Sequence, residues 1–245
     1  MQNLRICQER GRKTLIIFKC AGYKIGHDLF FSIPDFSAMK KIWDISPLIS
    51  PDGPVFPGDA PYRVKWVSNY SPENPLNLCS INLSPHIGAH ADAPLHISEG
   101  GQAISDIDLW PFIGTCRVIH ALNCGPLIFP KHLIHAPAPL PERILIRSRL
   151  AAPSVWESNF TALAPETIQW LHEQNVRLIG IDAPSIDPLN SKTLPSHNKL
   201  FEVNMRILEN LVLDEIPENY FELIALPLKL EGACASPVRA VLRSL

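Results

Sequence analysis

The sequence predicts a mixed α/β domain with more strand than helix. Apolar and polar residues alternate in several short stretches, and a period of two is typical of strands. The 24 prolines are dispersed singly between apolar runs, which suits short strands and structured loops better than a helix bundle. A chain of 245 residues, 46% of them hydrophobic, has ample material for a core.

The first 38 residues differ in charge from the rest. They carry six Lys/Arg against three Asp/Glu, a net of +3, whereas the other 207 residues carry 16 against 21, a net of −5. We therefore predict that residues 1–38 form a poorly ordered extension, or lie upstream of the true start, and that residues 39–245 form the functional domain beginning at Met39. A docked N-terminal element is the alternative.

From Met39 onward the elements follow one another at short intervals. We predict one clear helix over residues 165–175, opened by Thr161 or Pro165, with a face that includes Ile168 and Leu171. The run 176–182 reads as a buried strand that ends in a loop, and residues 47–61 as a loop. The other predicted strands cover residues 41–46, 62–70, 76–84, 114–122, 143–147, 220–226 and 238–243.

Composition excludes several classes of function. The net charge is −2 and no basic run occurs, so nothing favours nucleic acid or an anionic membrane surface as a partner. No apolar stretch reaches the roughly 18 residues that a transmembrane helix needs. The six cysteines form no Cys-x-x-Cys pair, and we expect reduced, mostly buried thiols in a cytoplasmic protein.

The most informative segment is residues 84–96, because His86, His90, Asp92 and His96 all occupy even positions in it. A strand projects alternate side chains to one face, so all four groups would enter one space. A helix would scatter them, and Gly88 also disfavours one. Imidazoles and a carboxylate that converge predict a metal-dependent hydrolytic site. A closed structural zinc site, or hydrogen-bonded core histidines, is the alternative.

Spacing alone leaves His96 undecided between a fourth ligand and a proton shuttle. The candidates for a second metal are His197 and Glu209. A straight helix would separate them by about 18 Å. If both are ligands, His197 must therefore lie in the loop after Pro195, and the chain must bend before Glu209. The competing interpretation puts Glu209 on a solvated helix face.

The remaining polar residues have simpler readings. Asp182, Ser185 and Asp187 are predicted to serve turns and caps rather than catalysis. No Gly-x-Ser-x-Gly elbow or phosphate-binding loop occurs. Surface or packing roles are expected for His27, His120, His132, His135 and His172.

Over most of residues 39–245 the sequence resembles the metal-dependent cyclase family, and within it the branch of bacterial kynurenine formamidases (arylformamidases). The histidine segment is specific to the wider family, and the whole set of motifs in this order points to the formamidase branch. The segments that carry the resemblance are 43–46, 54–59, 84–96, 180–187, 191–193, 208–214 and 235–241.

The resemblance implies a strand-rich swivelling β/β/α domain, assembled as a homodimer or larger, with two Zn²⁺ ions per subunit and Mn²⁺ as the alternative ion. It assigns His86, His90 and Asp92 to the first metal, His197 to the second, and Asp92 with Glu209 to both. It makes His96 the proton donor and acceptor and Phe56 a contact of the substrate ring.

The implied reaction is hydrolysis of N-formyl-L-kynurenine, a small molecule of tryptophan degradation, to L-kynurenine and formate. Water activated at the metal site attacks the formyl carbon, and His96 protonates the departing arylamine. Two alternatives stay open: another amide hydrolase of the family, such as one acting on isatin, and a non-catalytic metal-binding protein with a closed coordination shell.

Overall fold

The structure, a computed structural model, describes residues 6–7, 15–16 and 40–245. The chain divides into two units, Met1–Lys40 and Lys41–Leu245. In the first unit, the described residues form a pair of short antiparallel strands, β1 (Ile6–Cys7) and β2 (Leu15–Ile16). The rest of the predicted extension 1–38, with His27 and Met39, lies outside the described residues.

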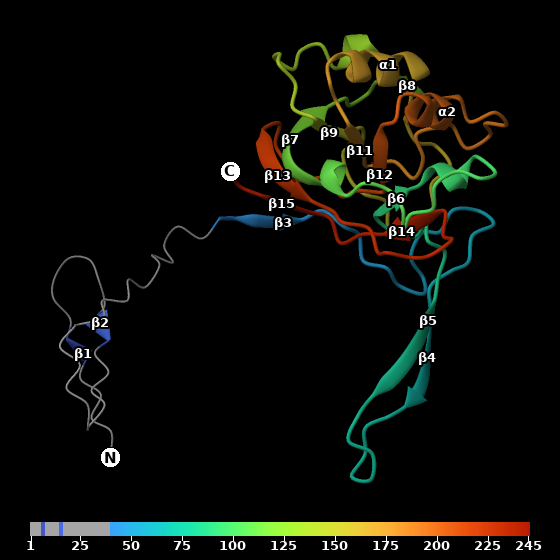
Figure 1. The fold of residues 1–245 in the computed structure, drawn as a ribbon, viewed down its shortest axis with the longest axis vertical. Helices are drawn as coiled ribbons and strands as arrows, with labels where there is room; N and C mark the ends of the chain where they lie inside the picture. Colours follow the sequence, from blue (N-terminus) through green and yellow to red (C-terminus); the bar gives the residue numbers. More distant parts are fainter. Residues whose placement is uncertain (1–5, 8–14, 17–39) are drawn as a thin grey trace. The chain divides into compact units, whose positions relative to one another are not determined.

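The second unit is built on a nine-stranded sheet (Figure 1). Four neighbouring strands, β12, β11, β9 and β7, run parallel, and the strands on either side of them are antiparallel. In order across the sheet, the strands are β14 (Ala235–Pro237), β6 (His90–Asp92), β12 (Arg206–Glu209), β11 (Leu178–Ile181), β9 (Arg143–Arg147), β7 (Ile113–His120), β13 (Tyr220–Ile224), β15 (Val241–Arg243) and β3 (Ile42–Asp44).

Two helices, α1 (Pro165–Glu173) and α2 (Pro195–Glu202), lie beside each other over one face of this sheet (Figure 1). Pro165 is the first residue of α1, where its missing N–H costs nothing. The helix buries Ile168 and Leu171 against the sheet, as the pattern predicted.

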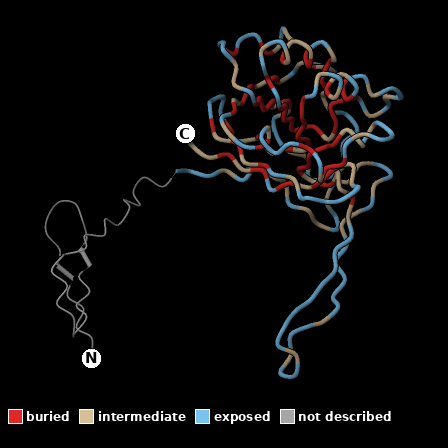
Figure 2. Tube along the Cα trace, viewed as in Figure 1, coloured by how far each residue is buried: buried red, intermediate tan, exposed pale blue. Residues whose placement is uncertain are grey.

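Hydrophobic clusters cover both faces of the sheet, because alternate residues of each strand point to opposite sides. In β9, Ile144 and Ile146 pack into the cluster beneath the helices, whereas Leu145 joins a second cluster on the other face with Phe112 and Phe221. Figure 2 shows this buried interior as the red core of the sheet region. Strands buried on both faces explain why 143–147 and 176–182 read as nearly continuous apolar runs.

A long hairpin of β4 (Arg63–Ser68) and β5 (Leu78–Asn82) projects from the sheet region, and its residues are exposed along most of its length (Figures 1 and 2). The smaller elements are a parallel pair, β8 (Leu127–Ile128) with β10 (Ala162–Leu163), and three short 3-10 helices, η2 (Pro94–His96), η3 (Trp110–Phe112) and η4 (Pro130–His132).

The prediction of a mixed α/β domain with more strand than helix is confirmed. Some boundaries are wrong: the helix ends at Glu173, and only Val241–Arg243 of the last predicted strand belongs to β15. Within the described part of the chain, no helix combines the length and the apolar character needed to cross a membrane.

Candidate functional site

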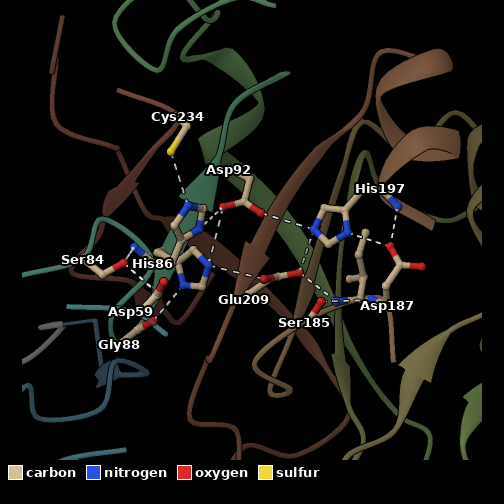
Figure 3. Close-up of polar contacts among 12 residues, drawn as sticks. Asp59, Ser84, His86, Gly88, Asp92, Ser185, Asp187, His197, Glu209 and Cys234 are labelled. Carbon is tan, nitrogen blue, oxygen red and sulfur yellow. Dashed lines mark hydrogen bonds and ion pairs between the residues drawn. The ribbon is translucent and has the colours of Figure 1, made fainter. Parts of the chain in front are cut away.

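The histidine segment folds as a turn followed by a short strand. His90 and Asp92 lie on β6, but His86 lies in the preceding turn and His96 ends η2, so the prediction of one continuous strand is wrong. Gly88 causes the break: its φ is +64°, and a Cβ there would lie 2.8 Å from Ile49 Cγ1. The turn nevertheless directs His86 back toward the strand residues (Figure 3).

His197 and Glu209 join this group from two other elements. His197 lies in the first turn of α2 rather than in a loop, so that prediction is wrong. Glu209 ends β12 directly opposite His90 of β6, and only 3% of it is exposed, which rules out the solvated helix face. The chain does turn between them, as the spacing required, through Asn204 with a φ of +54°.

Asp92 lies at the centre of the cluster (Figure 3). Its Oδ1 is 2.9 Å from His86 Nδ1 and 3.6 Å from His90 Nε2, and its Oδ2 is 3.3 Å from His197 Nε2. Glu209 lies alongside, with Oε2 3.3 Å from His90 Nε2 and Oε1 3.5 Å from His197 Nε2. Asp92 therefore faces three imidazoles and Glu209 faces two of them.

Backbone and side-chain partners fix the orientation of the two most buried imidazoles. His90 Nδ1 is 2.9 Å from the Gly88 carbonyl oxygen, and His197 Nδ1 is 2.7 Å from Asp187 Oδ2. Donation of each Nδ1–H to these oxygens leaves both Nε2 atoms directed toward the carboxylates, an orientation typical of metal-binding histidines. The Ile186 N–H donates to Glu209 Oε1 at 2.8 Å and holds that side chain as well.

Asp187 does more than the turn and capping role predicted for it. Its carboxylate accepts the backbone N–H groups of Ser196 and His197, so it caps α2 from a distant loop. Leu194, which precedes the helix, provides no such cap. The same carboxylate orients the His197 ring, so one residue fixes both the helix end and its imidazole.

The electrostatics of the cluster keep both carboxyl groups ionised. Burial opposes the charge on Asp92 and Glu209, but the neighbouring imidazoles outweigh it and lower both pKa values, for Asp92 well below the usual range. Burial also opposes protonation of His90, yet Glu209 and Asp92 raise its pKa to about 9. Burial likewise opposes protonation of His197, but Asp187 and Asp92 outweigh it and raise the pKa of His197 well above its ordinary value.

Several polar atoms of this cluster are buried without a hydrogen bond of suitable geometry among the described residues. They are both carboxylate oxygens of Asp92 and Nε2 of His197. Buried polar atoms normally have partners, because leaving them unpaired is costly. Two groups that share Asp92, one with His86 and His90 and one with His96 and His197, bring their ligand atoms within 4.8 Å of one another. Nitrogen and carboxylate donors at this spacing fit a divalent metal such as zinc or manganese.

His96 lies at the exposed edge of the cluster. Its ring centroid is 4.2 Å from that of His86 and 5.7 Å from that of His197. Desolvation of the inner part of the ring lowers the pKa of His96, despite the nearby Asp92 carboxylate. A neutral imidazole in this place can accept a proton at neutral pH.

Cys234 also contacts the cluster, with its Sγ 3.4 Å from His86 Nε2 (Figure 3). Cys79, Cys116, Cys124 and Cys234 are free thiols, but of these four only Cys116 is buried, so the prediction of mostly buried thiols is wrong for them. Cys79 is exposed on the hairpin, and Cys124 and Cys234 are half-buried.

A pocket opens next to this cluster. His86, Ile87 and Gly88 form one part of its wall, and Phe56 and Trp156 form another. The rings of Phe56 and Trp156 meet edge to face with centroids 5.1 Å apart. Phe56 therefore lies where a substrate near the cluster would meet an aromatic surface.

Comparison with known proteins places the chain in a family. The model of the Cyclase family, described as "Putative cyclase", matches residues 43–188. The chain belongs to the cyclase family. It is 59% identical over 208 residues to the kynurenine formamidase of Bordetella pertussis, covering 84% of this chain and 100% of the relative. It is 54% identical over 205 residues to that of Polaromonas naphthalenivorans, covering 84% and 92%. These relatives confirm the predicted family and branch.

Solved structures share the fold. A protein described as a "predicted metal-dependent hydrolase from Bacillus stearothermophilus" superposes with a TM-score of 0.73 at 26% identity, covering 85% of this chain and 100% of that one. Isatin hydrolase A from Labrenzia aggregata superposes with a TM-score of 0.71 at 23% identity, covering 85% and 95%. The cyclase-family fold predicted from the sequence is confirmed.

Sequence reasoning missed two residues of this region. Asp187 was set apart because an Asp in a Pro- and Ser-rich turn is ordinarily a cap, and its distance of ten residues from His197 gave no sign of contact. Trp156 lies in a segment without periodicity. The described histidines outside the cluster have other partners where contacts are found: His120 Nε2 contacts the Ile216 carbonyl, and His135 contacts Glu218.

Proposed function

We propose that this chain is a metal-dependent formamidase that hydrolyses N-formyl-L-kynurenine to L-kynurenine and formate. The observation that carries the proposal is the 50–59% identity to kynurenine formamidases across nearly their whole length. The likeness to isatin hydrolases, at 21–23% identity, is one of fold. The chain is an amide hydrolase, and its identity to the kynurenine formamidases favours the formyl amide of an arylamine as the substrate class.

The metal centre in this proposal uses the cluster around Asp92. His86, His90 and Asp92 would hold one ion, His197 and Glu209 the other, with both carboxylates reaching both ions. Both Asp92 oxygens and His197 Nε2 are buried without a hydrogen bond of suitable geometry among the described residues, and this supports the assignment. We assign Zn²⁺ because nitrogen and carboxylate ligands suit it, with Mn²⁺ as the alternative. Such ions, when bound, supply a nucleophilic hydroxide at neutral pH and stabilise negative charge that develops on the carbonyl oxygen.

The protein's own residues transfer the proton and bind the aryl ring of the substrate. His96 receives a proton at its imidazole nitrogen and delivers it to the arylamine nitrogen as the C–N bond breaks, a role that its lowered pKa and edge position support. Phe56, together with Trp156, forms the wall against which the aryl ring packs. Stacking on such a wall contributes about 0.5–1.5 kcal/mol beyond the burial of area.

We also propose a homodimer in which the β4–β5 hairpin contacts the second subunit. Cross-strand pairing puts Val64 opposite Ile81 and Trp66 opposite Cys79, so one hairpin face is apolar. These side chains are exposed in the single chain, 56% for Trp66 and 61% for Ile81. An apolar face of this kind is typical of an interface.

We further propose that the protein is cytoplasmic. The free thiols of Cys79, Cys116, Cys124 and Cys234 support this setting, because thiols stay reduced there.

A formate-release assay tests the proposed reaction. Purified protein loaded with Zn²⁺ should release formate from N-formyl-L-kynurenine, and it should leave isatin unopened under the same conditions. Turnover of isatin without formate release from N-formyl-L-kynurenine would overturn the substrate assignment.

Light scattering on a sizing column tests the assembly. The wild-type chain should elute with the mass of two subunits, and Trp66→Glu should shift it toward one. Lys65→Glu, on the opposite hairpin face, is the matched control and should leave the dimer intact. A wild-type monomer would contradict the proposal.

A further inference from the structure

Two oppositely charged side chains line the pocket beside the aromatic wall. Arg149 and Glu157 both belong to the pocket lining, Arg149 half-buried and Glu157 exposed. Among the described residues, neither side chain makes an ion pair, and neither makes a side-chain hydrogen bond. Charged groups that share a pocket wall without local partners remain free to pair with a ligand.

The backbone at Arg149 is fixed, whereas its guanidinium makes no hydrogen bond or ion pair among the described residues. The Arg149 N–H donates to Asp182 Oδ2 at 3.2 Å, and Ser148 donates to the same carboxylate through its N–H and its hydroxyl. Asp182 is buried and already engaged by these donors. The segment after β9 therefore presents the Arg149 side chain to the pocket from an anchored position, with its five N–H donors available.

Glu157 directly follows Trp156, whose ring meets Phe56 edge to face. The pocket thus combines an aromatic surface with the charged side chains of Arg149 and Glu157, and the buried Asp182 also lines it. His86 of the metal cluster forms another part of its wall. A ligand that fills all of these features carries an aryl ring, a carboxylate and an ammonium group. The reacting amide must lie at the His86 side, because the cluster is there.

We propose that Arg149 and Glu157 form a subsite for a zwitterionic α-amino acid group, with Arg149 binding the α-carboxylate and Glu157 the α-ammonium. This inference rests on the proposed function and specifies how the substrate's amino-acid end is held. Arg149 provides the stronger contact, because guanidinium–carboxylate pairs can be bidentate and Arg149 is the less exposed of the two. The subsite favours substrates that carry an α-amino acid group over neutral aryl amides.

Two substrates separate this subsite from the reacting centre. N-formyl-L-kynurenine carries the amino-acid group, and N-(2-acetylphenyl)formamide has the same formanilide and ketone without it. Arg149→Met should raise KM for the first at least about tenfold and change it less than about twofold for the second. Arg149→Lys should restore part of the loss, since it keeps the charge but not the fork. Glu157→Gln should raise KM for the first substrate by about threefold.

The controls make the result decisive. Lys229→Met removes an exposed cation outside the pocket and should change neither substrate, and melting temperature and metal content should match the wild type for every variant. Equal losses on both substrates, or no loss on N-formyl-L-kynurenine, would overturn the subsite. A wild-type enzyme that releases formate from neither substrate would instead overturn the proposed function.

Discussion

The deep side and the open side of the cluster differ in how tightly their residues are held. On the deep side, His90, His197 and Glu209 are each at most 3% exposed, and each has a second partner that fixes its orientation. On the open side, the His86 side chain is 16% exposed, and the His96 ring lies against it at the edge, tilted by 45°. The difference indicates that the residues of the deep side hold the metal ions, whereas those of the open side contact the substrate and transfer the proton.

Asp92 joins the two sides, so its loss should have the largest effect. Asp92→Asn removes the one carboxylate that faces imidazoles of both, and we expect activity to fall more than about a thousandfold together with metal content. Elemental analysis alongside formate release measures both. Glu166→Gln, an exposed acid on α1, is the matched control and should match the wild type. Full metal content with full activity in Asp92→Asn would contradict the central place of this residue.

His96 tests the open side alone. His96→Ala should lower kcat by about a hundredfold or more, the usual size of a general acid–base contribution, while metal content stays at the wild-type level. The same two measurements apply. Loss of metal from this variant would make His96 a metal ligand and place it with the residues of the deep side.

A substitution of Asp187 tests the deep side without replacing a proposed ligand. Asp187→Asn weakens the contact that orients His197, and we expect metal affinity at that position to fall about tenfold to a hundredfold. Titration against a competing chelator measures it, and activity should recover at high metal concentration because the ligand itself remains. Unrecovered activity at saturating metal would show that Asp187 acts in some other way.

Metal binding should also depend on pH. In the metal-free protein the pKa of His90 is about 9, so this imidazole is protonated at pH 7 and must lose its proton to bind an ion. The pKa of His197 is raised in the same direction. Affinity should therefore rise with pH between 6 and 9, and calorimetry in buffers of different ionisation enthalpy should detect proton release. Binding that is independent of pH would contradict neutral imidazole ligands at these positions.

Local patterns predicted what depends on neighbouring residues. The run 143–147 alternates between the two faces of the sheet, so β9 could be placed from sequence with its observed bounds. The histidine segment likewise predicted a cluster, because its three imidazoles and one carboxylate are close together in the chain. The positive φ of Gly88 could not be foreseen from spacing, and for this reason His86 was assigned to a strand rather than to a turn.

Contacts between distant segments were beyond local reasoning. Glu209 meets His90 because β12 pairs antiparallel with β6, and that register follows from the whole sheet. His197 reaches them through α2, whose position on the sheet depends on the cluster beneath the helices. Reasoning from the residues named both only as candidates, with the condition that the chain must bend, and the resemblance to the cyclase family assigned them to the metal site.

The most direct test of the whole account is a titration of metal-free protein with Zn²⁺ while formate release from N-formyl-L-kynurenine is followed. We predict no activity without metal and activity that rises with the ions bound, reaching its maximum at two per chain. Full activity in protein shown to be free of metal would contradict this prediction.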